Sequence, residues 1–426
     1  MKAWAARGRI ALLLKGSATC LRTRRKQVLP TNSRRFQSTE VAPKHVADRL
    51  WASFWRGGTS KGVFIAERSL PFKWTTQEDF QMGLQRTFRS VLGSPDKYGR
   101  QLNGLGGGLS SLSKAVIYKA APEGDEEADV EYLFIQLGIK DGKLDLSGNC
   151  GNLSSVVGPL ALNEGYAKLA PVGEGASGDS KEITVRLRNL NTSKIIHSIS
   201  SASGVINEDS RWNFKPDGDY SIDGVSGTAS KVLLQFTKPG GAKTGQTLPT
   251  RNAVDVVKTS DDSVEASLVD VTNPGIFVDG TTLGWKTEAT PDQLNAQTDL
   301  MRRLELIRKR GTEMMGLEPN DSAVPKIVLV YPPASADVDI SCQALSMEQA
   351  HKAVPGTLAL NLAAACKLPG TIPNRLARTT ADATVIIGHP SGRAVVGANV
   401  KDGVVESVEL GRTARCLMEG WINCDE

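Results

Sequence analysis

The stretch Asp145-Leu-Ser-Gly-Asn-Cys-Gly-Asn152 runs directly into the apolar segment Leu153–Leu162. Apolar residues of that segment recur at the i, i+3, i+4 and i+7 spacing of one helical face. The pattern therefore predicts a helix, although Pro159 removes one of its hydrogen bonds. The apolar run Tyr132–Gly138 before it has strand character. The predicted order is a strand, a glycine-broken turn and a helix that holds the thiol of Cys150 at its start.

This turn combines an anion site with a reactive group. Free backbone N–H groups and the positive end of the helix dipole converge at the start of a helix. A carboxylate would be favoured there, with Cys150 beside it as a nucleophile or proton carrier. From this stretch alone, a Gly- and Asn-rich turn with a buried, inert cysteine is an equally good interpretation.

The N-terminal segment has the composition of an address signal. Residues 1–39 contain ten Lys or Arg, and the first acidic residue is Glu40. Such an Arg-rich, Ser- and Thr-bearing, acid-free segment is typical of a mitochondrial transit peptide. We expect residues 1–46 to be a transit peptide or disordered, with processing near Arg34–Ser38 and a mature protein in the matrix. A basic arm or a nucleic-acid tail is the alternative, but its basic residues are not interleaved with aromatic ones.

Removing that segment reverses the charge of the chain. The sequence has 51 Lys and Arg and 46 Asp and Glu, so without the ten basic residues the balance is 41 against 46, a formal charge of −5. We therefore expect no nucleic-acid partner. The apolar run Ile10–Leu14 is far too short to span a bilayer, and no membrane association is expected. Six cysteines without a Cys-x-x-Cys pair and four scattered histidines predict free thiols and no transition-metal site.

Two further segments carry groups suited to an anionic ligand. Arg56-Gly-Gly-Thr-Ser-Lys-Gly62 is expected to be a hairpin turn that can grip an anion, although an ordinary solvated hairpin is favoured on spacing alone. Ser110–Lys114 leads into the predicted strand Ala115–Tyr118. A Lys at the mouth of a strand is usually solvated. If Lys114 is buried facing the thiol, desolvation lowers its pKa toward the useful range for a base.

Strands and helices alternate along the rest of the chain, which predicts a mixed α/β or α+β protein with much antiparallel pairing. About 380 residues exceed a single core, so two domains are expected, bounded as 47–205 and 206–395, with 396–426 packing at their junction. Pro355-Gly-Thr357 opens an apolar helix that echoes Gly151–Leu162 and suggests duplication. Other expected elements are the strands Trp51–Trp55, Val63–Ala66, a pair within Glu182–Ile199, Lys231–Phe236, Val264–Val271, Ile276–Val278 and Lys326–Tyr331, a hairpin Ala394–Glu409 around Asp402-Gly403, the helix Thr76–Leu92 and one long helix from Thr290-Pro291 to Gly311.

Ten short motifs occur in a fixed order, and together they resemble one family. They are Arg56–Gly62, Leu92–Asp96, Gly104–Gly107, Ser113-Lys114, Ser147–Asn152, Asn273-Pro274, Met315-Gly316, Pro369–Thr371, Gly388–Gly392 and Arg412–Arg415. The family is PrpF, which comprises 2-methylaconitate and methylitaconate isomerases and includes aconitate and 4-oxalomesaconate isomerases. The resemblance covers residues 47–426.

The resemblance implies an α+β fold like that of diaminopimelate epimerase, with two pseudo-symmetric domains, each a curled, mostly antiparallel sheet around a central helix. It implies an isomerase without metal or organic cofactor that shifts a proton and a double bond in an unsaturated di- or tricarboxylate. The catalytic pair would be Lys114 and Cys150, with Lys114 assigned as base and the opposite assignment open. A homodimer is a fold-level expectation. The substrate-binding residues would be Arg56, Thr59, Ser60, Lys61, Ser113, Asn149, Gly151, Asn152, Asn273, Gly356, Thr357, His389 and Ser391.

One departure from the parent fold bears on the reaction. Amino-acid epimerases of this fold use two opposed cysteines, one at each central helix, whereas here Cys366 lies well past the first turn of the second helix. Inversion of a stereocentre by two thiols is therefore disfavoured. A racemase or epimerase of the same fold is the alternative enzyme. A non-catalytic accessory protein of the methylcitrate pathway is the alternative outside catalysis.

Overall fold

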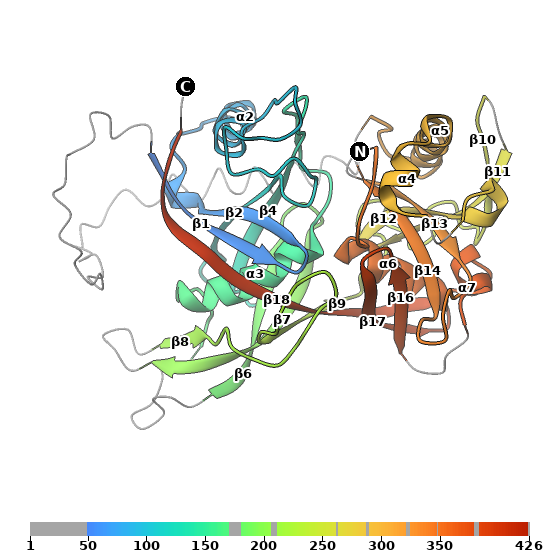
Figure 1. Cartoon of the computed structure of the whole chain (residues 1–426). Helices are drawn as coiled ribbons and strands as arrows, with labels where there is room; N and C mark the ends of the chain where they lie inside the picture. Colours follow the sequence, from blue (N-terminus) through green and yellow to red (C-terminus); the bar gives the residue numbers. More distant parts are fainter. Residues whose placement is uncertain are drawn as a thin grey trace.

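The computed structural model describes residues 49–169, 180–205, 211–260, 263–286, 289–320, 324–346, 348–378 and 383–424. The predicted transit peptide lies outside these ranges. The described chain forms two halves, each with strands wrapped around one helix, and they are joined along the strand β18 (Val404–Asn423) (Figure 1). The mixed, strand-rich α/β class predicted from the sequence is confirmed.

The first half surrounds the helix α3 (Gly151–Asn163), which confirms the helix predicted from the opening stretch. Every residue of α3 from Gly151 to Leu162 is buried, as expected for a helix that is apolar on all sides. Two of its strand pairs, β2 with β3 and β4 with β6, are parallel, and the others are antiparallel. Its strands are β1 (Arg49–Gly57), β2 (Ser60–Ala66), β3 (Lys114–Ala120), β4 (Val130–Leu137), β5 (Leu144–Asp145), β6 (Ser180–Asn189), β7 (Lys194–Val205), β8 (Arg211–Phe214) and β9 (Lys231–Thr237).

The second half surrounds the helix α6 (Gly356–Lys367), whose residues are buried from Gly356 to Cys366. The short helix α7 (Ile372–Leu376) packs beside it. The strands of this half are β10 (Asp255–Lys258), β11 (Ser263–Val271), β12 (Asn273–Asp279), β13 (Lys326–Tyr331), β14 (Ile340–Ser346), β15 (Gln349–Ala350), β16 (Thr384–His389) and β17 (Gly392–Lys401). β10, β14 and β15 were not predicted.

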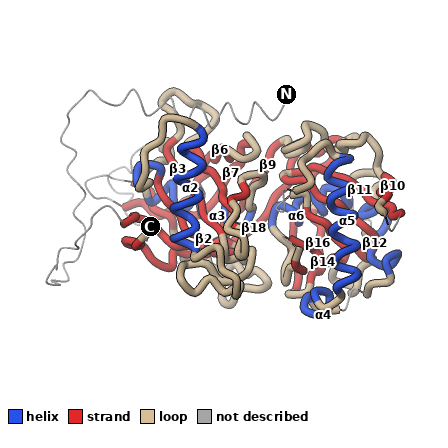
Figure 2. Tube along the Cα trace, turned by 90° about the horizontal axis from the view of Figure 1, so that it is seen from above, coloured by secondary structure: helices blue, strands red, loops and turns tan. Residues whose placement is uncertain are grey.

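Each half has a second apolar layer on the outer side of its strands. Along β2, Phe64 packs with the core around α3, whereas its neighbours Val63 and Ile65 pack against α2 (Gln77–Leu92). This alternation follows from the two-residue period of a strand. Figure 2 shows α2 and α5 (Thr298–Met314) covering the first and second halves respectively. The central helices are therefore enclosed, and only their ends are available for a site.

The strand β18 connects the two halves. The predicted hairpin turn at Asp402-Gly403 is confirmed, because both residues adopt positive φ. The strand then continues far beyond the predicted hairpin and pairs antiparallel with β17, β9 and finally β1. The last strand of the described chain therefore pairs with the first one, β1. These residues are too far apart in sequence for a local pattern to predict the pairing.

The long helix predicted from Thr290 is wrong. Thr290 does form the expected capping box, but the helix α4 (Pro291–Asn295) ends after five residues. Gln297 has a non-helical backbone (φ −87°, ψ 76°), and α5 starts at the next residue. The break allows the buried side chains of Leu294 and Leu304 to reach the core from two separate helices.

Other sequence expectations have mixed outcomes. The five cysteines among the described residues are free thiols. Within the described part of the chain, no helix is long and apolar enough to cross a membrane, and no group of three or more His, Cys, Asp or Glu could hold a metal ion. The boundary proposed at residue 206 stays a prediction, although β8 and β9, which follow it, pair with β7 of the first half.

Candidate active site

The two enclosed helices meet at their N-termini. Cys150 is the N-cap of α3, and Pro355 is the N-cap of α6. A Cβ atom on Gly151 would lie 3.0 Å from the backbone nitrogen of Thr357, and one on Gly356 would lie 3.3 Å from that of Asn152. Glycine thus permits the close approach, and the positive ends of two helix dipoles converge on one place.

Asn273 of β12 holds this junction together. Its Oδ1 accepts the N–H of Asn149 at 3.1 Å, and its Nδ2 donates to the carbonyl of Asn149 at 2.7 Å and to Thr357 Oγ1 at 3.1 Å. The neighbouring Thr272 donates its hydroxyl to the carbonyl of Thr357 at 2.9 Å. Asn273 therefore positions both helix starts without lining the space between them.

A small pocket lies at the junction, and we call it the Lys114–Cys150 pocket. Its volume is about 30 Å³, room for little more than a water molecule, so a carboxylic acid can enter only when the walls move apart. Eight residues predicted from the sequence line it: Ser60, Lys114, Asn149, Cys150, Gly151, Asn152, Gly356 and Thr357. Lining residues that were not predicted as site residues include Ser110, Phe134, Gln136, Lys326, His351 and Pro355.

Lys114 is a buried amine without an ionic partner among the described residues. The residue is 9% exposed, and its Nζ donates a hydrogen bond to Gln136 Oε1 and lies 5.1 Å from the centre of the Phe134 ring. The Gln136 amide nitrogen donates to the carbonyls of Ser113 at 2.9 Å and Ser110 at 3.2 Å, which turns its oxygen toward the lysine. Burial lowers the pKa of Lys114, while nearby Cys150 and Asp145 oppose the shift.

A second lysine reaches the same pocket from the other half. Lys326 is the first residue of β13, and burial and the charge of Lys114 lower its pKa to about 8. His351 also lines the pocket, where burial and Lys114 lower its pKa to about 4. The histidine is therefore neutral near neutral pH, and the two amines are the basic groups of the site.

Cys150 is held in place by its backbone. Its N–H donates to Asn149 Oδ1 at 2.7 Å, and its carbonyl accepts the N–H of Ser154 at 2.9 Å in the first turn of α3. The same Asn149 oxygen accepts the hydroxyl of Tyr132 at 3.2 Å and the amide of Asn189 at 3.3 Å. The partly exposed thiol therefore sits on a fixed turn.

The remaining predicted residues lie outside this pocket. Ser113 is buried and bonds Gln101 and the carbonyl of Leu137, and Arg56 donates to the carbonyl and hydroxyl of Thr413. Lys61 stacks over Phe54, and Ser391 donates to the carbonyl of Lys352 on the exposed surface. Thr59 and His389 line a neighbouring pocket that also contains Arg412.

The other buried thiols do not reach the Lys114–Cys150 pocket. Burial raises the pKa of Cys342 to about 12 and that of Cys366 further still. Cys366 lies near the end of α6, and its carbonyl accepts the amide of Asn374. The position on α6 that corresponds to Cys150 on α3 is occupied by Pro355, which has no proton to exchange.

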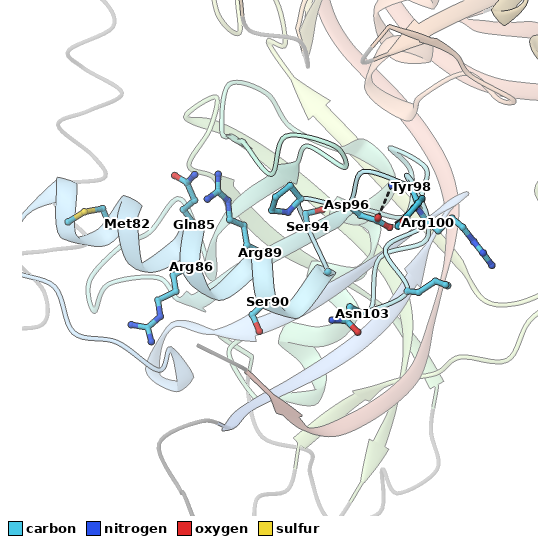
Figure 3. Close-up of a pocket in the computed structure, with 13 residues that line it drawn as sticks. Met82, Gln85, Arg86, Arg89, Ser90, Ser94, Asp96, Tyr98, Arg100 and Asn103 are labelled. Atoms are coloured by element: carbon cyan, nitrogen blue, oxygen red, sulfur yellow. Dashed lines mark hydrogen bonds between the residues drawn. The ribbon is translucent and has the colours of Figure 1, made fainter.

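A larger pocket lies elsewhere on the described part of the chain. Figure 3 shows it along the outer face of α2 and the following loop. Its volume is about 910 Å³. Arginines at positions 86, 89 and 100 line it, and the carboxylate of Asp96 accepts the backbone N–H groups of Tyr98 and Arg100. None of the residues predicted for the site contributes to it.

The arrangement at the helix junction suits proton transfer on an anion. A basic amine and a thiol share a small, desolvated space with amide groups of two helix N-termini. Such donors can stabilise negative charge that develops on a bound carboxylate. Two signals for the missed residues were present in the sequence: Gln136 and Lys326 lie at the ends of apolar strands, where polar side chains often face a site.

Comparison with known proteins gives a consistent result. The chain matches the family model described as PrpF protein over residues 48–425. It is 36% identical to 3-methylitaconate isomerase of Eubacterium barkeri over 86% of this chain and 95% of that protein. It is 34% identical to 2-methyl-aconitate isomerase of Shewanella oneidensis over 90% and 98%.

Solved structures agree with the sequence comparison. The crystal structure of methylitaconate-delta-isomerase is 35% identical, with a TM-score of 0.65 over 88% of this chain and 95% of that one. A hydroxyproline epimerase from Agrobacterium vitis shares the fold, with 12% identity and a TM-score of 0.50 over 89% and 94%. The resemblance recognised in the ten motifs is thereby confirmed. The chain belongs to the PrpF protein family and is an isomerase of that family.

Proposed function

We propose that this protein moves a carbon–carbon double bond by a 1,3-proton shift in an unsaturated di- or tricarboxylate such as 2-methylaconitate or aconitate. The observation that carries the proposal is that Lys114 and Cys150 line one pocket at the junction of two helix N-termini. The names of the relatives support the same class, since they are isomerases of methylitaconate and methylaconitate.

In the proposed reaction Lys114 acts as the base. Its neutral amine takes a proton from the carbon next to the double bond, and the electrons of the broken C–H bond spread over the allyl system onto a carboxylate. The amide groups of Gly151, Asn152, Gly356 and Thr357 would stabilise that dienolate more than the starting acid. Cys150 then gives a proton to the other end of the allyl system, and the reverse assignment of the two residues remains the alternative.

A racemase or epimerase is the second candidate, and the N-caps weigh against it. Two-thiol inversion needs a proton carrier at the start of each central helix, and Pro355 occupies the second position. Relocation of a double bond needs one base and one acid, which Lys114 and Cys150 supply from a single pocket, so no thiol is required at the start of α6. Relocation of the double bond is therefore the reaction that this residue set supports best.

Two further proposals concern the domains of the chain and its N-terminal segment. We propose that the two halves, with α3 and α6 in equivalent places, are pseudo-symmetric domains of the diaminopimelate-epimerase-like kind. We also propose that the basic segment 1–46 directs the protein to mitochondria and is removed there. Fusing residues 1–46 to a fluorescent protein tests the address: mitochondrial fluorescence supports it, and diffuse fluorescence contradicts it.

The function is tested by assaying purified residues 40–426 with 2-methylaconitate, cis- and trans-aconitate, 4-oxalomesaconate and 3-methylitaconate. The change in double-bond absorbance reports turnover, and proton NMR identifies the product. We expect turnover of at least one of these acids, with losses of about 10²- to 10⁴-fold in kcat for Lys114→Met and Cys150→Ala.

Matched controls are available in the same elements. Lys119, on the same strand as Lys114, pairs with Glu67, and Cys416 is an exposed thiol on β18. Lys119→Met and Cys416→Ala should keep wild-type turnover. A folded wild-type protein that turns over none of these acids, or a Lys114→Met variant as active as the controls, would contradict the proposal. Complex formation that survives while no activity is ever found would favour an accessory role.

A further inference from the structure

A second pocket adjoins the Lys114–Cys150 pocket, and Asn152 links the two. The Asn152 side chain lines the first pocket, its Nδ2 donates to Thr59 Oγ1 at 3.0 Å and to Ser60 Oγ at 3.3 Å, and its Oδ1 accepts Arg412 Nε at 2.9 Å. Thr59 and Arg412 line the second pocket, which has a volume of about 270 Å³. We call it the Arg412 pocket.

Arg412 is the unusual feature of this pocket. It is only 7% exposed, and among the described residues its guanidinium bonds Asn152 and, at 2.9 Å, the carbonyl of Gly411. No carboxylate of the described residues lies within ion-pair distance, and Nη2 has no hydrogen bond to them. Burial lowers its pKa to about 10, so it remains cationic near neutral pH. A buried cation without a counter-charge is costly unless an anion binds it.

The surrounding groups leave the pocket suited to an anion. His389 is neutral near neutral pH, because burial and Arg412 lower its pKa to about 4. The one carboxylate in the wall, Asp223, accepts the backbone N–H of Arg393 at 2.7 Å and lies 3.9 Å from its guanidinium. Arg393 also pairs with Asp337 at 2.7 Å. Arg393 thus lies between two carboxylates, Asp223 in the wall and Asp337 outside it, and these three groups sum to a charge of −1. Within the wall itself Arg393 balances Asp223, and Arg412 is the remaining cation.

The hairpin between β1 and β2 is shaped to fit over Asn152 and Arg412. Gly58 has a positive φ of 51°, and a Cβ there would lie 2.4 Å from Asn152 Oδ1 and 2.9 Å from Arg412 Cδ. The Gly58 N–H donates to the carbonyl of Thr413 at 3.0 Å, which fixes the turn to β18. Only glycine allows this approach, and it brings the Thr59 hydroxyl into the wall of the pocket.

We propose that the Arg412 pocket is a subsite for the third carboxylate of a tricarboxylate whose reacting carbons lie in the Lys114–Cys150 pocket. The inference rests on the proposed function and narrows its substrate class to tricarboxylates over dicarboxylates. The two pockets are one amide side chain apart, so a single small substrate can span them once the walls separate. A planar guanidinium with two unbonded N–H groups on Nη2 matches a carboxylate, and the Thr59 hydroxyl can donate a further hydrogen bond.

The test uses unreactive acids, so that binding is measured apart from turnover. Tricarballylate has three carboxylates, and 2-methylsuccinate is the same skeleton with one terminal carboxylate replaced by hydrogen. Calorimetry is run with wild type, Arg412→Gln, Arg412→Lys and the control Arg415→Gln, an exposed arginine on the same strand. We expect Arg412→Gln to weaken tricarballylate binding about 10- to 100-fold and 2-methylsuccinate binding less than 3-fold.

Arg412→Lys keeps the charge but not the planar fork, and an intermediate loss that is again specific for tricarballylate is expected. Arg412→Lys also provides the binding test if the Arg412→Gln variant does not fold. Equal losses for both acids would assign Arg412 to holding Asn152 and overturn the subsite, as would unchanged binding of tricarballylate. If Arg412 discriminates the two acids while wild type isomerises nothing, the subsite stands and the proposed function falls. If wild type isomerises dicarboxylates as well as tricarboxylates, the function stands and the subsite falls.

Discussion

Lys114 owes its chemical character to the residues around it. Burial favours its neutral amine, and among the described residues its hydrogen-bond partner is a neutral amide, Gln136. A carboxylate in that position would hold the lysine as an ammonium ion, which cannot accept a proton. The identity of residue 136 therefore matters as much to the base as the lysine itself.

Replacing Gln136 by Glu should therefore impair the enzyme near neutral pH. The added negative charge raises the pKa of Lys114, so the acid limb of the kcat/KM profile moves to higher pH and activity at pH 7 falls at least about 10-fold. Gln136→Leu, which adds no charge, should move the limb the other way, because the ammonium form loses an acceptor. Profiles of both variants check this, and limbs that do not move would contradict it.

Lys326 predicts a pH effect on substrate binding. Its pKa of about 8 means that its positive charge, which attracts a carboxylate, is present below pH 8 and lost above it. KM should therefore rise as the pH increases through 8. Lys326→Met should have a high KM at every pH, whereas Lys326→Arg should keep a low one up to pH 9. A wild-type KM that stays constant from pH 7 to 9 would argue against this role.

At the scale of elements, the site depends on how closely α3 and α6 approach. The approach was not predictable from either helix alone, although both helices and their glycine starts were identified in the sequence. Four site residues could be predicted because they lie in motifs that are typical of helix N-termini: Cys150, Gly151, Gly356 and Thr357. Asn273 also belonged to a recognised motif. Its side chain forms hydrogen bonds to the starts of both helices, and only the folded chain shows these contacts.

Gly151→Ala tests the approach directly. The new methyl group would lie 3.0 Å from Thr357 N and 3.2 Å from Thr357 Cγ2, so the helix starts must separate by a few tenths of an ångström. We expect kcat/KM to fall about 10²-fold, since small misplacements of catalytic groups are costly. The thermal midpoint should change little.

Gly420→Ala is the matched control, because nothing lies within 4 Å of a Cβ at that position. It should retain wild-type activity and stability. A Gly151→Ala enzyme of normal activity would show that the two helix starts need not meet so closely. A large loss of stability in that variant would instead place the glycine in folding.

At the scale of the whole molecule, the sequence predicted the two central helices and most strands, because their apolar patterns are local. It did not reveal that β18 runs across both halves to pair with β1, since that pairing joins residues about 370 positions apart, such as Arg49 and Asn423. Lys326 and Lys114 share a pocket for the same reason. Their nearness depends on the packing of the two halves, which no local spacing encodes.

The whole fold should be sensitive to acid. Burial lowers the pKa values of His351 and His389 to about 4 from an ordinary value of 6.5. Between these values the unfolded chain binds more protons, so the stabilisation present above pH 6.5 is lost as the pH falls toward 4. At pH 5, protonation linked to each histidine should lower the free energy of unfolding by about 2 kcal/mol relative to neutral pH. Urea unfolding at pH 7 and pH 5 measures the loss, and a His351→Gln, His389→Gln double variant should lose clearly less; an equal loss would contradict this account.

The central claim is that Lys114 removes an allylic proton from a substrate bound between the two helix starts, and that Cys150 returns a proton at the other end of the allyl system. The most direct measurement follows 2-methylaconitate and trans-aconitate by proton NMR in D₂O with wild type and Lys114→Met. Wild type should isomerise an acid and introduce deuterium at its allylic carbon. Lys114→Met should do neither, while it still binds tricarballylate within a few-fold of wild type. Deuterium exchange at the wild-type rate in Lys114→Met would show that another group moves the proton and would contradict the account.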